Sequence, residues 1–331
     1  MPDYRHFLHR GMNFATRFTV RRFTPVLARM ISYMARTGLG TDECLRRGAL
    51  PMPVHYHSPV PDLKDLEQRQ VWNRRSDLAG IDFRPEAQVA FLRELGQEFG
   101  RECDWPLLPS DDLHQLHIKN GNFSYGCAAS LHCVLRHFKP RRVIEIGSGN
   151  SSLVVAAALS LNSKESATGR GNYTIVDPYP RPIIENGLPG LTQLIKERVE
   201  LLDVGFFNDL RENDVLFIDS GHTVRTGSDV NYLMLEVLPR LSPGVIVHFH
   251  DIHLPYEYSR VYATNPQFRM FWTEAYLLQA FLCLNSQFEV LLGLAYLMMD
   301  QRDSFQSAFP LYDPIEHQDV SGSFWIRRRL A

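Results

Sequence analysis

Carboxylate and imidazole side chains, the groups that accept protons or bind cations near neutral pH, gather at two places in the sequence. Asp219 follows a short apolar run, and His222 comes three residues later. A second apolar run ends in His248–Asp251 (HFHD), where the alternation of a strand puts His248 and His250 on one face. A neutral imidazole accepts a proton near pH 7, and a bound cation lowers the pKa of a coordinated hydroxyl. These residues therefore predict chemistry on a hydroxyl group, with or without a metal ion.

A glycine-containing turn lies upstream of these residues. Glu145 stands near the end of an apolar run, and Gly147 and Gly149 follow it, which permits a tight turn and a close approach of the backbone to a ligand. Ser151 opens the helix predicted behind the turn, and a helix N-terminus is electropositive. Asp177 ends the next predicted strand, roughly 30 residues past the glycines, where a carboxylate can accept hydrogen bonds from ribose hydroxyls. Together these residues predict a nucleoside-binding turn.

Asp203 ends the third predicted strand, where its carboxylate can accept a hydrogen bond from an adenine amino group. The third glycine of a dinucleotide-binding turn is missing, because Ser152 stands in its place. That departure argues against NAD. The strand ends therefore predict a pocket for a nucleoside without a pyrophosphate.

The elements that must position these residues follow Pro140, where short apolar runs alternate with helical stretches. Nearly continuous apolar runs are typical of strands buried on both faces of a parallel sheet. Two strands near the C-terminus, expected at 288–292 and 324–326, follow one another without a clear crossover helix, which permits an antiparallel pair at the sheet edge. Strands are expected at 142–146, 173–176, 199–202, 214–218, 244–250, 288–292 and 324–326, and helices at 151–161, 191–197, 228–238 and 271–284. The pattern predicts a doubly wound α/β fold, in which ligands bind at the carboxyl edge of the sheet.

Before residue 139 the pattern is different. Helical patterns at 7–34, 87–99 and 124–137 alternate with irregular pieces, and prolines exclude regular structure across 51–61. We therefore expect a helical and irregular cap over residues 1–120 on the substrate side. The sheet domain is expected over residues 121–331.

Three further expectations concern burial. His248 lies deeper in its strand than His250 and is interpreted as a hydrogen-bonded core residue rather than a ligand. His253 follows in a loop and is expected to face solvent. The helix at 271–284 is expected to bury one stripe at helical spacing: Tyr276, Leu277, Ala280 and Phe281.

From about Phe123 to the C-terminus, the chain resembles the class I S-adenosylmethionine-dependent methyltransferases. The resemblance rests on four runs and one aspartate: 143–149, Asp177, 214–219, 217–222 and 238–251. The last two runs are similar to a bacterial small-molecule subgroup of that superfamily. The resemblance implies a Rossmann-like sheet of seven strands with an antiparallel last strand. It also implies that residues 121–331 bind S-adenosylmethionine as the methyl donor.

The same resemblance assigns donor-binding roles to the strand ends. It places residues at the methionine moiety, the ribose and the adenine in turn: Glu145, Gly147 and Gly149, then Asp177, then Asp203. Ser151, directly behind the glycines, belongs to the same donor-binding set.

The fourth and fifth strands are also similar to those of cation-dependent, catechol-type O-methyltransferases. By position, this similarity implies Asp219, His250 and Asp251 as metal ligands and His222 as the general base. In that family an aspartate usually stands where this chain has His250, and a lysine where it has His222. An imidazole among carboxylates suits Mn²⁺, Fe²⁺ or Zn²⁺ better than Mg²⁺, which prefers oxygen ligands. We expect O-methylation of a sugar or secondary-metabolite hydroxyl. Metal-assisted catalysis, metal-free catalysis by His222 and a structural role for these histidines all stay open.

Two other functions stay open at this point. A metal-dependent hydrolase or oxygenase would use His248, His250 and Asp251, but it leaves the glycine turn and Asp177 without a role. A non-catalytic nucleoside-binding partner subunit would use the basic N-terminal arm as its interaction surface. The cap and the loop 252–268 are expected to decide which acceptor binds.

Composition narrows the class of protein. The 331 residues are 44% hydrophobic and carry a formal net charge of −2, which gives no global attraction to nucleic acid or to an anionic membrane. No apolar run reaches the length of a membrane span, since Val290–Met299 is about half of what is needed. The exposed sheet edge and apolar cap are compatible with a homodimer.

The cysteines and the N-terminal arginines bear on location. The 5 cysteines form no Cys-x-x-Cys pair, which favours a reducing compartment such as the cytoplasm. Arginines concentrate in the first residues with few acids, which is similar to a transit peptide in composition. We interpret this segment as a basic amphipathic arm on the surface and expect no secretory signal.

Overall fold

The computed structural model describes residues 14–165, 171–265, 269–317 and 320–330. Helix α2 therefore begins at Phe14, and the part of the predicted 7–34 helix before it lies outside the described residues. The chain divides into two compact units. One lies within residues 1–73 and 259–271, and the other within 74–258 and 272–331. The loop expected to select the acceptor is thus shared between the two units, and its residues 266–268 are not described.

The larger unit is built on a seven-stranded sheet with the order β3-β2-β1-β4-β5-β7-β6. Strands β1 to β5 run parallel, and β7 pairs antiparallel with both β5 and β6. The strands are β1 Arg142–Ile146, β2 Asn172–Val176, β3 Gln193–Ile195, β4 Val215–Ile218, β5 Ile246–Phe249, β6 Phe288–Gly293 and β7 Phe324–Arg328. The prediction of a doubly wound α/β sheet of seven strands with an antiparallel last strand is confirmed.

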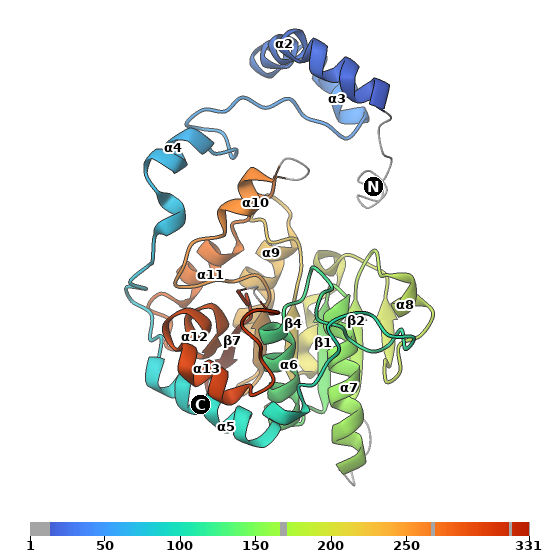
Figure 1. Cartoon of the computed structure of the whole chain (residues 1–331), viewed down its shortest axis with the longest axis vertical. Helices are drawn as coiled ribbons and strands as arrows, with labels where there is room; N and C mark the ends of the chain where they lie inside the picture. Colours follow the sequence, from blue (N-terminus) through green and yellow to red (C-terminus); the bar gives the residue numbers. More distant parts are fainter. Residues whose placement is uncertain (1–13, 166–170, 266–268, 318–319, 331) are drawn as a thin grey trace. The chain divides into compact units, whose positions relative to one another are not determined.

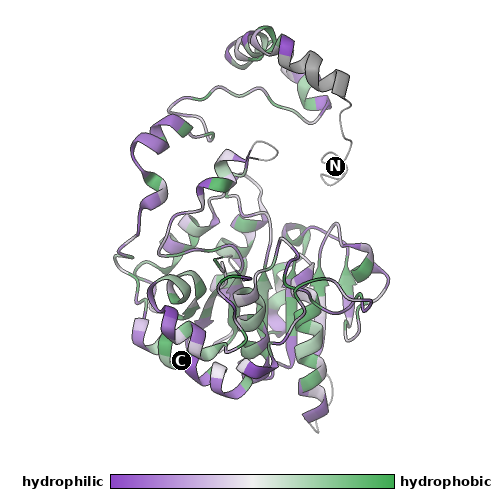
Figure 2. Cartoon of the chain, viewed as in Figure 1, coloured by the Kyte–Doolittle hydropathy of each residue, from purple (hydrophilic) through white to green (hydrophobic). Residues whose placement is uncertain are grey.

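Helices cover this sheet (Figure 1), and the central strands are strongly hydrophobic (Figure 2). Helices α5, α6, α7 and α13 pack against one another, while α9, η5 and α11 form a second group. Their bounds are α5 Pro85–Phe99, α6 Tyr125–Phe138, α7 Asn150–Glu165, α8 Pro182–Glu185, α9 Asp229–Tyr232, η5 Leu233–Val237, η6 Leu238–Arg240, α11 Glu274–Leu282, α12 Leu294–Asp300 and α13 Arg302–Ala308. Short 3₁₀ turns complete this unit: η2 Gly100–Glu102, η3 Val199–Leu201 and η4 Val204–Asp209.

Strand side chains alternate between two buried faces. Val143, Tyr173 and Phe217 belong to the hydrophobic core formed with α5, α6 and α7. Because Glu145 is two residues from Val143 in the same strand, its side chain points to the same face. The carboxylate is therefore directed toward α7 and into the core.

The third strand is where the sequence-based prediction was wrong. Residues 191–197 were expected to form a helix, but β3 lies at Gln193–Ile195. Residues 199–202 were expected to form that strand, but the segment is the 3₁₀ turn η3. Since β3 is a short, partly exposed edge strand, it lacks the continuous apolar run that marks the central strands.

The smaller unit is helical. Its elements are α2 Phe14–Thr37, α3 Thr41–Arg46, α4 Leu63–Gln68, η1 Val71–Asn73 and α10 Arg260–Thr264. Asp62 caps α4 by accepting a hydrogen bond from the Lys64 N–H at 2.9 Å. An ion pair of 2.6 Å between Arg260 and Glu67 joins α10 to α4 within this unit. Residues 74–120 belong to the sheet unit instead. That residues 1–120 form the acceptor side of the protein therefore stays a prediction.

Candidate active site

Backbone hydrogen bonds bring the segments after several parallel strands together at one edge of the sheet. The N–H groups of Gly147, Asp219 and His250 each donate to the last carbonyl of a neighbouring strand, at 2.9 Å in each case. The acceptors belong to β2, β1 and β4 respectively. The turn after β1 therefore lies beside the residues that follow β4, and those lie beside the residues that follow β5.

Gly147 is required by the way the turn after β1 meets the segment after β4. Its φ of +83° lies in the left-handed region, and a Cβ atom there would stand 2.1 Å from the carbonyl oxygen of Asp219. Gly149 has room for a side chain, since a Cβ atom would meet only the Arg181 guanidinium, at 3.6 Å. The N–H of Gly149 donates to Ser152 Oγ at 3.0 Å, which fixes the start of α7.

Several buried polar atoms at this edge have no hydrogen-bond partner among the described residues, and two of them directly follow Gly149 and Asp219 in the chain. These two are Asn150 Nδ2, at the first residue of α7, and Ser220 Oγ, directly after Asp219. The first turn of α7 also carries no acidic side chain that would repel an anionic ligand group. An unpaired buried polar atom costs free energy unless a ligand pairs with it. This edge therefore fits a polar ligand such as a nucleoside.

Glu145 and Ser151 hold the turn from behind. The Glu145 side chain is fully buried and accepts hydrogen bonds from Ser151 Oγ at 2.6 Å and from the Tyr173 hydroxyl. Burial raises the pKa of Glu145 to about 7, although the hydrogen bonds from Ser151 and Tyr173 act to lower it. Glu145 and Ser151 therefore hydrogen-bond to each other in the interior, behind the glycine turn.

The raised pKa makes Glu145 a source of pH-dependent stability. The folded protein holds this proton more tightly than the unfolded chain, whose glutamate has a pKa of 4.5. Its contribution is therefore full below about pH 4.5 and is lost as the pH rises through about 7, for a total of about 3 kcal/mol. We expect thermal unfolding of donor-free Glu145→Gln to be less sensitive to pH than that of the wild type between pH 5 and 8. Parallel pH profiles of the melting temperature would contradict this expectation.

Asp177 lies beside the glycine turn, as predicted from the strand ends. Its buried carboxylate accepts hydrogen bonds from Ser148 Oγ and from the Tyr179 N–H, the latter at 2.7 Å. These contacts orient the carboxylate at the carboxyl end of β2, where the register of β1 and β2 brings it next to the turn.

Asp203 has a different setting from the one expected. It does not end a strand, because it is the exposed residue that caps η4 and accepts a hydrogen bond from the Gly205 N–H at 2.7 Å. The strand that motivated its role is absent at this position, so contact with adenine stays a prediction.

The acidic and imidazole residues after β4 and β5 form one cluster. His222 Nε2 lies 3.2 Å from Asp219 Oδ1 and 3.6 Å from Asp251 Oδ2. His250 Nδ1 lies 3.5 Å from Asp219 Oδ1 and 3.4 Å from Asp251 Oδ2. Both imidazoles therefore face the same two carboxylates.

Glu274 is a member of this cluster that the sequence analysis missed. It is the first residue of α11, its side chain is only 1% exposed, and its Oε2 lies 2.8 Å from His222 Nδ1. Its Oε1 is buried without a hydrogen-bond partner among the described residues. Thr273 and Glu274 also donate their backbone N–H groups to the His222 carbonyl, at 2.9 and 3.1 Å. The start of α11 thus holds both the backbone and the ring of His222.

Two cluster residues have left-handed backbone conformations that non-glycine residues rarely adopt. The φ of His222 is +53° and that of Asp251 is +58°. Such conformations cost of order 1–3 kcal/mol each and concentrate at functional sites. Here they turn His222 and Asp251 toward Asp219, which carries their side chains into one cluster.

The charges in the cluster stabilise one another. Burial lowers the pKa of His222, but the hydrogen bonds with Asp219 and Glu274 outweigh burial and raise the pKa to about 10. Burial likewise lowers the pKa of His250, but the charges of Asp251 and Asp219 raise it well above its ordinary value. Conversely, burial raises the pKa values of Asp219 and Asp251, and the two imidazoles hold both below their usual range. Without a ligand the cluster therefore holds imidazolium and carboxylate groups at neutral pH.

The donor set of this cluster fits a divalent cation. Asp219, His222 and Asp251 each offer an atom within 4.8 Å of the others, and His250 Nδ1 is buried without a hydrogen-bond partner in the described structure. His250 Nδ1 lies 3.5 Å from Asp219 Oδ1 and 3.4 Å from Asp251 Oδ2, although the group whose ligand atoms all lie within 4.8 Å of one another contains His222 rather than His250.

His248 stands apart from the cluster, as expected for a core residue. It is fully buried, its ring stacks 4.2 Å from Phe217, and its Nε2 lies 2.8 Å from Ser323 Oγ. Burial lowers its pKa well below the ordinary value. A site that needs His248, His250 and Asp251 as ligands therefore loses one of its three members. His253 was expected to face solvent, but it is only 8% exposed.

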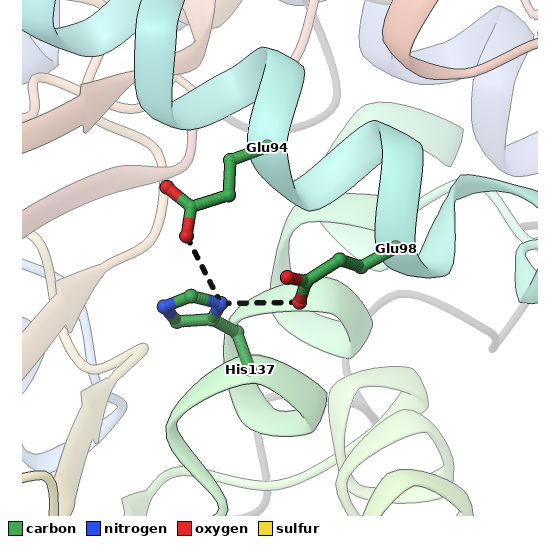
Figure 3. A group of neighbouring side chains, drawn as sticks. All are labelled: Glu94, Glu98 and His137. Carbon is green, nitrogen blue, oxygen red and sulfur yellow. Dashed lines mark hydrogen bonds and ion pairs between the residues drawn. The ribbon is translucent and has the colours of Figure 1, made fainter.

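A second group of histidine and carboxylates lies on the surface between two helices (Figure 3). His137 Nδ1 lies 3.4 Å from Glu98 Oε2 and 3.9 Å from Glu94 Oε1. Both glutamates are about half exposed, and the ring of His137 packs edge-on against Phe91 at 5.4 Å. These are partly exposed side-chain contacts on the surface at the end of α6, of a kind that contributes little to stability.

A cavity of about 280 Å³ lies in the same unit as the cluster. Polar and aromatic side chains dominate its lining, among them Arg74, Arg75, Tyr256, Glu257, Tyr276 and Gln279. Tyr258 and His253 line it as well. The ring of Tyr258 lies 5.9 Å from Trp272, and that of Trp272 lies 4.6 Å from His222. The cavity is thus separated from the cluster by a short run of packed rings.

Comparisons with known proteins give a family model, a sequence relative and a solved structure to which the chain is similar. Residues 144–252 match a family model described as a methyltransferase domain. An uncharacterized protein of Archaeoglobus fulgidus is 31% identical over 173 residues, which cover 50% of this chain and 76% of that protein. A crystal structure of a putative protein-L-isoaspartate O-methyltransferase from Plasmodium falciparum, in complex with S-adenosyl-L-homocysteine, aligns over 57% of this chain and 81% of that one. Its sequence identity is 11% and the TM-score is 0.27.

Proposed function

The chain belongs to the class I S-adenosylmethionine-dependent methyltransferases, and on that premise we propose that it methylates a hydroxyl oxygen of a small molecule. One observation carries the proposal. The glycine turn that takes the donor in this family touches the segment that opens the acid–imidazole cluster, since a Cβ atom at Gly147 would overlap the Asp219 carbonyl. A hydroxyl must lose a proton to become a good nucleophile, and this cluster supplies groups that accept one.

The donor-binding residues follow from the strand ends. We propose that Gly147 and Gly149 let the backbone approach the methionine moiety, with Glu145 and Ser151 holding the turn in place. Asp177 is proposed to accept hydrogen bonds from the ribose hydroxyls, and Asp203 to lie at the adenine. The bound donor supplies a methyl group on a positively charged sulfur, which transfers to an aligned nucleophile.

His222 is proposed as the general base, acting through Nε2. Its Nδ1 donates to Glu274, which leaves Nε2 directed at Asp219 and Asp251. Because these carboxylates favour the protonated imidazole, a cation bound to them would free Nε2 to accept the hydroxyl proton. Asp219, His250 and Asp251 are the residues proposed to hold that cation, and a mixed nitrogen and oxygen set favours Mn²⁺, Fe²⁺ or Zn²⁺ over Mg²⁺.

Metal analysis together with chelation tests the cation. If the proposed ligands hold it, purified protein contains metal, loses activity on stripping and regains it with one of these ions. Asp251→Asn should then lower the metal content as well as the activity. Full activity in metal-free protein would remove the cation from the mechanism.

Glu274 is proposed as a positioning residue for His222. Glu274→Gln keeps the size of the side chain but removes the charge beside Nδ1, so we expect kcat to fall about 10-fold to 100-fold with KM for both substrates little changed. Removing this carboxylate also lowers the pKa of His222, so the acidic limb of the pH–rate profile should move to lower pH. Glu236→Gln, which removes an exposed carboxylate from η5, is the matched control. A loss of stability without a change in the profile would show a purely structural role.

The acceptor is proposed to be a polyhydroxylated molecule such as a sugar or a secondary metabolite. The cavity near the cluster offers hydrogen-bonding groups on several sides, among them Glu257, which accepts from the Tyr276 hydroxyl. Arg74 and Arg75 belong to the region before residue 121, which we assigned to the acceptor side. Incubation with a methyl-labelled donor and fractionated metabolites tests the proposal. Label on oxygen of a small molecule supports it, and label on nitrogen, on carbon or on protein contradicts it.

The protein is proposed to lie in the cytoplasm. It is proposed to be a monomer or a homodimer. All 5 cysteines are free, including the buried Cys103 and Cys133, whose sulfur atoms lie 3.6 Å apart. Free thiols at this separation are expected in a reducing compartment.

A further inference from the structure

Helix α2 of the smaller unit presents a large apolar surface that its own unit does not cover. Six large apolar side chains on this helix are 41–59% exposed: Phe23, Val26, Leu27, Met30, Ile31 and Tyr33. At 100° per residue these positions span an arc of about 160° on one side of the helix. Clusters of this kind on a surface mark interaction sites. We propose that α2 lies on an anionic lipid bilayer, with this apolar face buried in the headgroup region.

The arginines of α2 indicate which partner covers that face. Arg22, Arg29 and Arg36 follow one another at seven-residue intervals, which puts them within about 40° of each other along one border of the apolar arc. No ion pair joins any of the three to a carboxylate among the described residues. The side opposite the apolar arc carries small or hydroxylated residues, such as Ala28 and Ser32, and Ser32 Oγ accepts a hydrogen bond from the Arg36 guanidinium at 3.2 Å.

The helix also lacks the groups that a bilayer would repel. Its sequence from Phe14 to Thr37 contains no aspartate or glutamate. A helix with one apolar face, arginines at its border and no acidic residue suits a membrane surface, where the arginine stems lie along the interface and the guanidinium groups meet lipid phosphates. Figure 2 shows hydrophobic and hydrophilic residues alternating along this helix.

The helix would lie along the membrane rather than cross it. No helix among the described residues is long and apolar enough to span a bilayer. The whole chain has a net charge of −2, so the attraction is local to this helix. A second copy of the chain is the other occupant to consider, but like-charged arginine borders meet less favourably against each other than against anionic lipid.

Vesicle sedimentation of the full-length chain tests this proposal. We expect the protein to pellet with vesicles of phosphatidylcholine mixed with phosphatidylglycerol, and to remain in solution with phosphatidylcholine alone or at high salt. Replacing Arg22, Arg29 and Arg36 together by glutamine should weaken binding about 100-fold. The matched control replaces three exposed arginines of the sheet unit by glutamine: Arg93, Arg141 and Arg240.

A second pair of variants tests the apolar face. Phe23→Ser with Met30→Ser should abolish pelleting, whereas Leu113→Ser with Leu284→Ser, at apolar residues that are 73% and 86% exposed on the sheet unit, should leave it unchanged. Donor binding should be the same in all variants, because the sheet unit is untouched on the donor side. Equal pelleting of the α2 variants and controls would overturn the proposal. So would a dimer that forms without lipid and is lost in the same α2 variants, with no vesicle binding.

Discussion

Replacing His222 by alanine is expected to lower kcat for methyl transfer by about 10²-fold to 10⁴-fold while donor affinity stays unchanged. The reason is geometric. His222 Nδ1 is held by Glu274 at 2.8 Å, and Nε2 faces Asp219 at 3.2 Å, so one ring nitrogen is fixed and the other is directed at the cluster. A steady-state assay with saturating donor and acceptor, combined with calorimetry of donor binding, measures both quantities.

The alanine variant also leaves the buried carboxylate of Glu274 without its partner, which would lower stability. The double variant His222→Ala with Glu274→Gln removes that unpaired charge and should recover stability but not activity. His114→Ala, at an exposed histidine, is the control for loss of an imidazole in general. Turnover within a few-fold of wild type in folded His222→Ala would mean that another group accepts the proton.

Gly147→Ala is expected to abolish donor binding and to destabilise the fold. Two effects act together at this position. A non-glycine residue at φ +83° costs roughly 1–2 kcal/mol, and the added Cβ would stand 2.1 Å from the Asp219 carbonyl oxygen. The segment that carries Asp219 must then move, and a shift of about 1 Å at a reacting centre costs on the order of 100-fold in rate.

Gly190→Ala separates the two effects. Gly190 has φ +91°, but a Cβ atom added there would meet no atom of the described residues within 4 Å beyond its own chain neighbours. This variant therefore carries the backbone cost without the overlap. We expect Gly190→Ala to lower the melting temperature slightly and to bind donor normally. Donor affinity that is equally affected in both variants, or in neither, would show that the close approach at Gly147 plays no part in the site.

The central strands were predictable because both faces are buried. Strands β1, β2, β4 and β5 are buried at most of their positions, and Asp177, Asp219 and His250 directly follow β2, β4 and β5 at the carboxyl edge. The edge strand β3 gave no such signal. From Leu191 to Glu197 the apolar residues stand at 191, 194 and 195, which is the spacing of an amphipathic helix. The strand was therefore expected later, and Asp203 was placed at the end of a strand that is absent.

Glu274 was missed because the buried face of its helix was assigned wrongly. The predicted core stripe contained Tyr276, which is 49% exposed, whereas the buried residues are Glu274, Ala275, Leu278 and Leu282. A glutamate in an i, i+4, i+8 series with two leucines is the signal that would have found it. Hydropathy alone cannot reveal such a residue, because the partner of the buried carboxylate, His222, lies 52 positions away in sequence.

The net charge of the whole chain did not reveal the basic character of helix α2. A net charge of −2 excludes a global attraction to anionic surfaces, and that exclusion holds for the chain as a whole. The arginines of α2 act locally, because exposed charges separated by more than about 8 Å are largely screened at physiological salt. The proposed lipid partner of α2 follows from the position of its arginines along one side of the helix, and not from the net charge of the chain.

We propose that the turn after β1 and the carboxylate after β2 form one pocket for S-adenosylmethionine. Isothermal titration of the full chain with S-adenosylmethionine tests this pocket. We expect saturable binding at one site per chain, weakened at least 10-fold by Asp177→Asn and lost in Gly147→Ala. Absence of binding to the wild type, or binding that neither substitution changes, would contradict it.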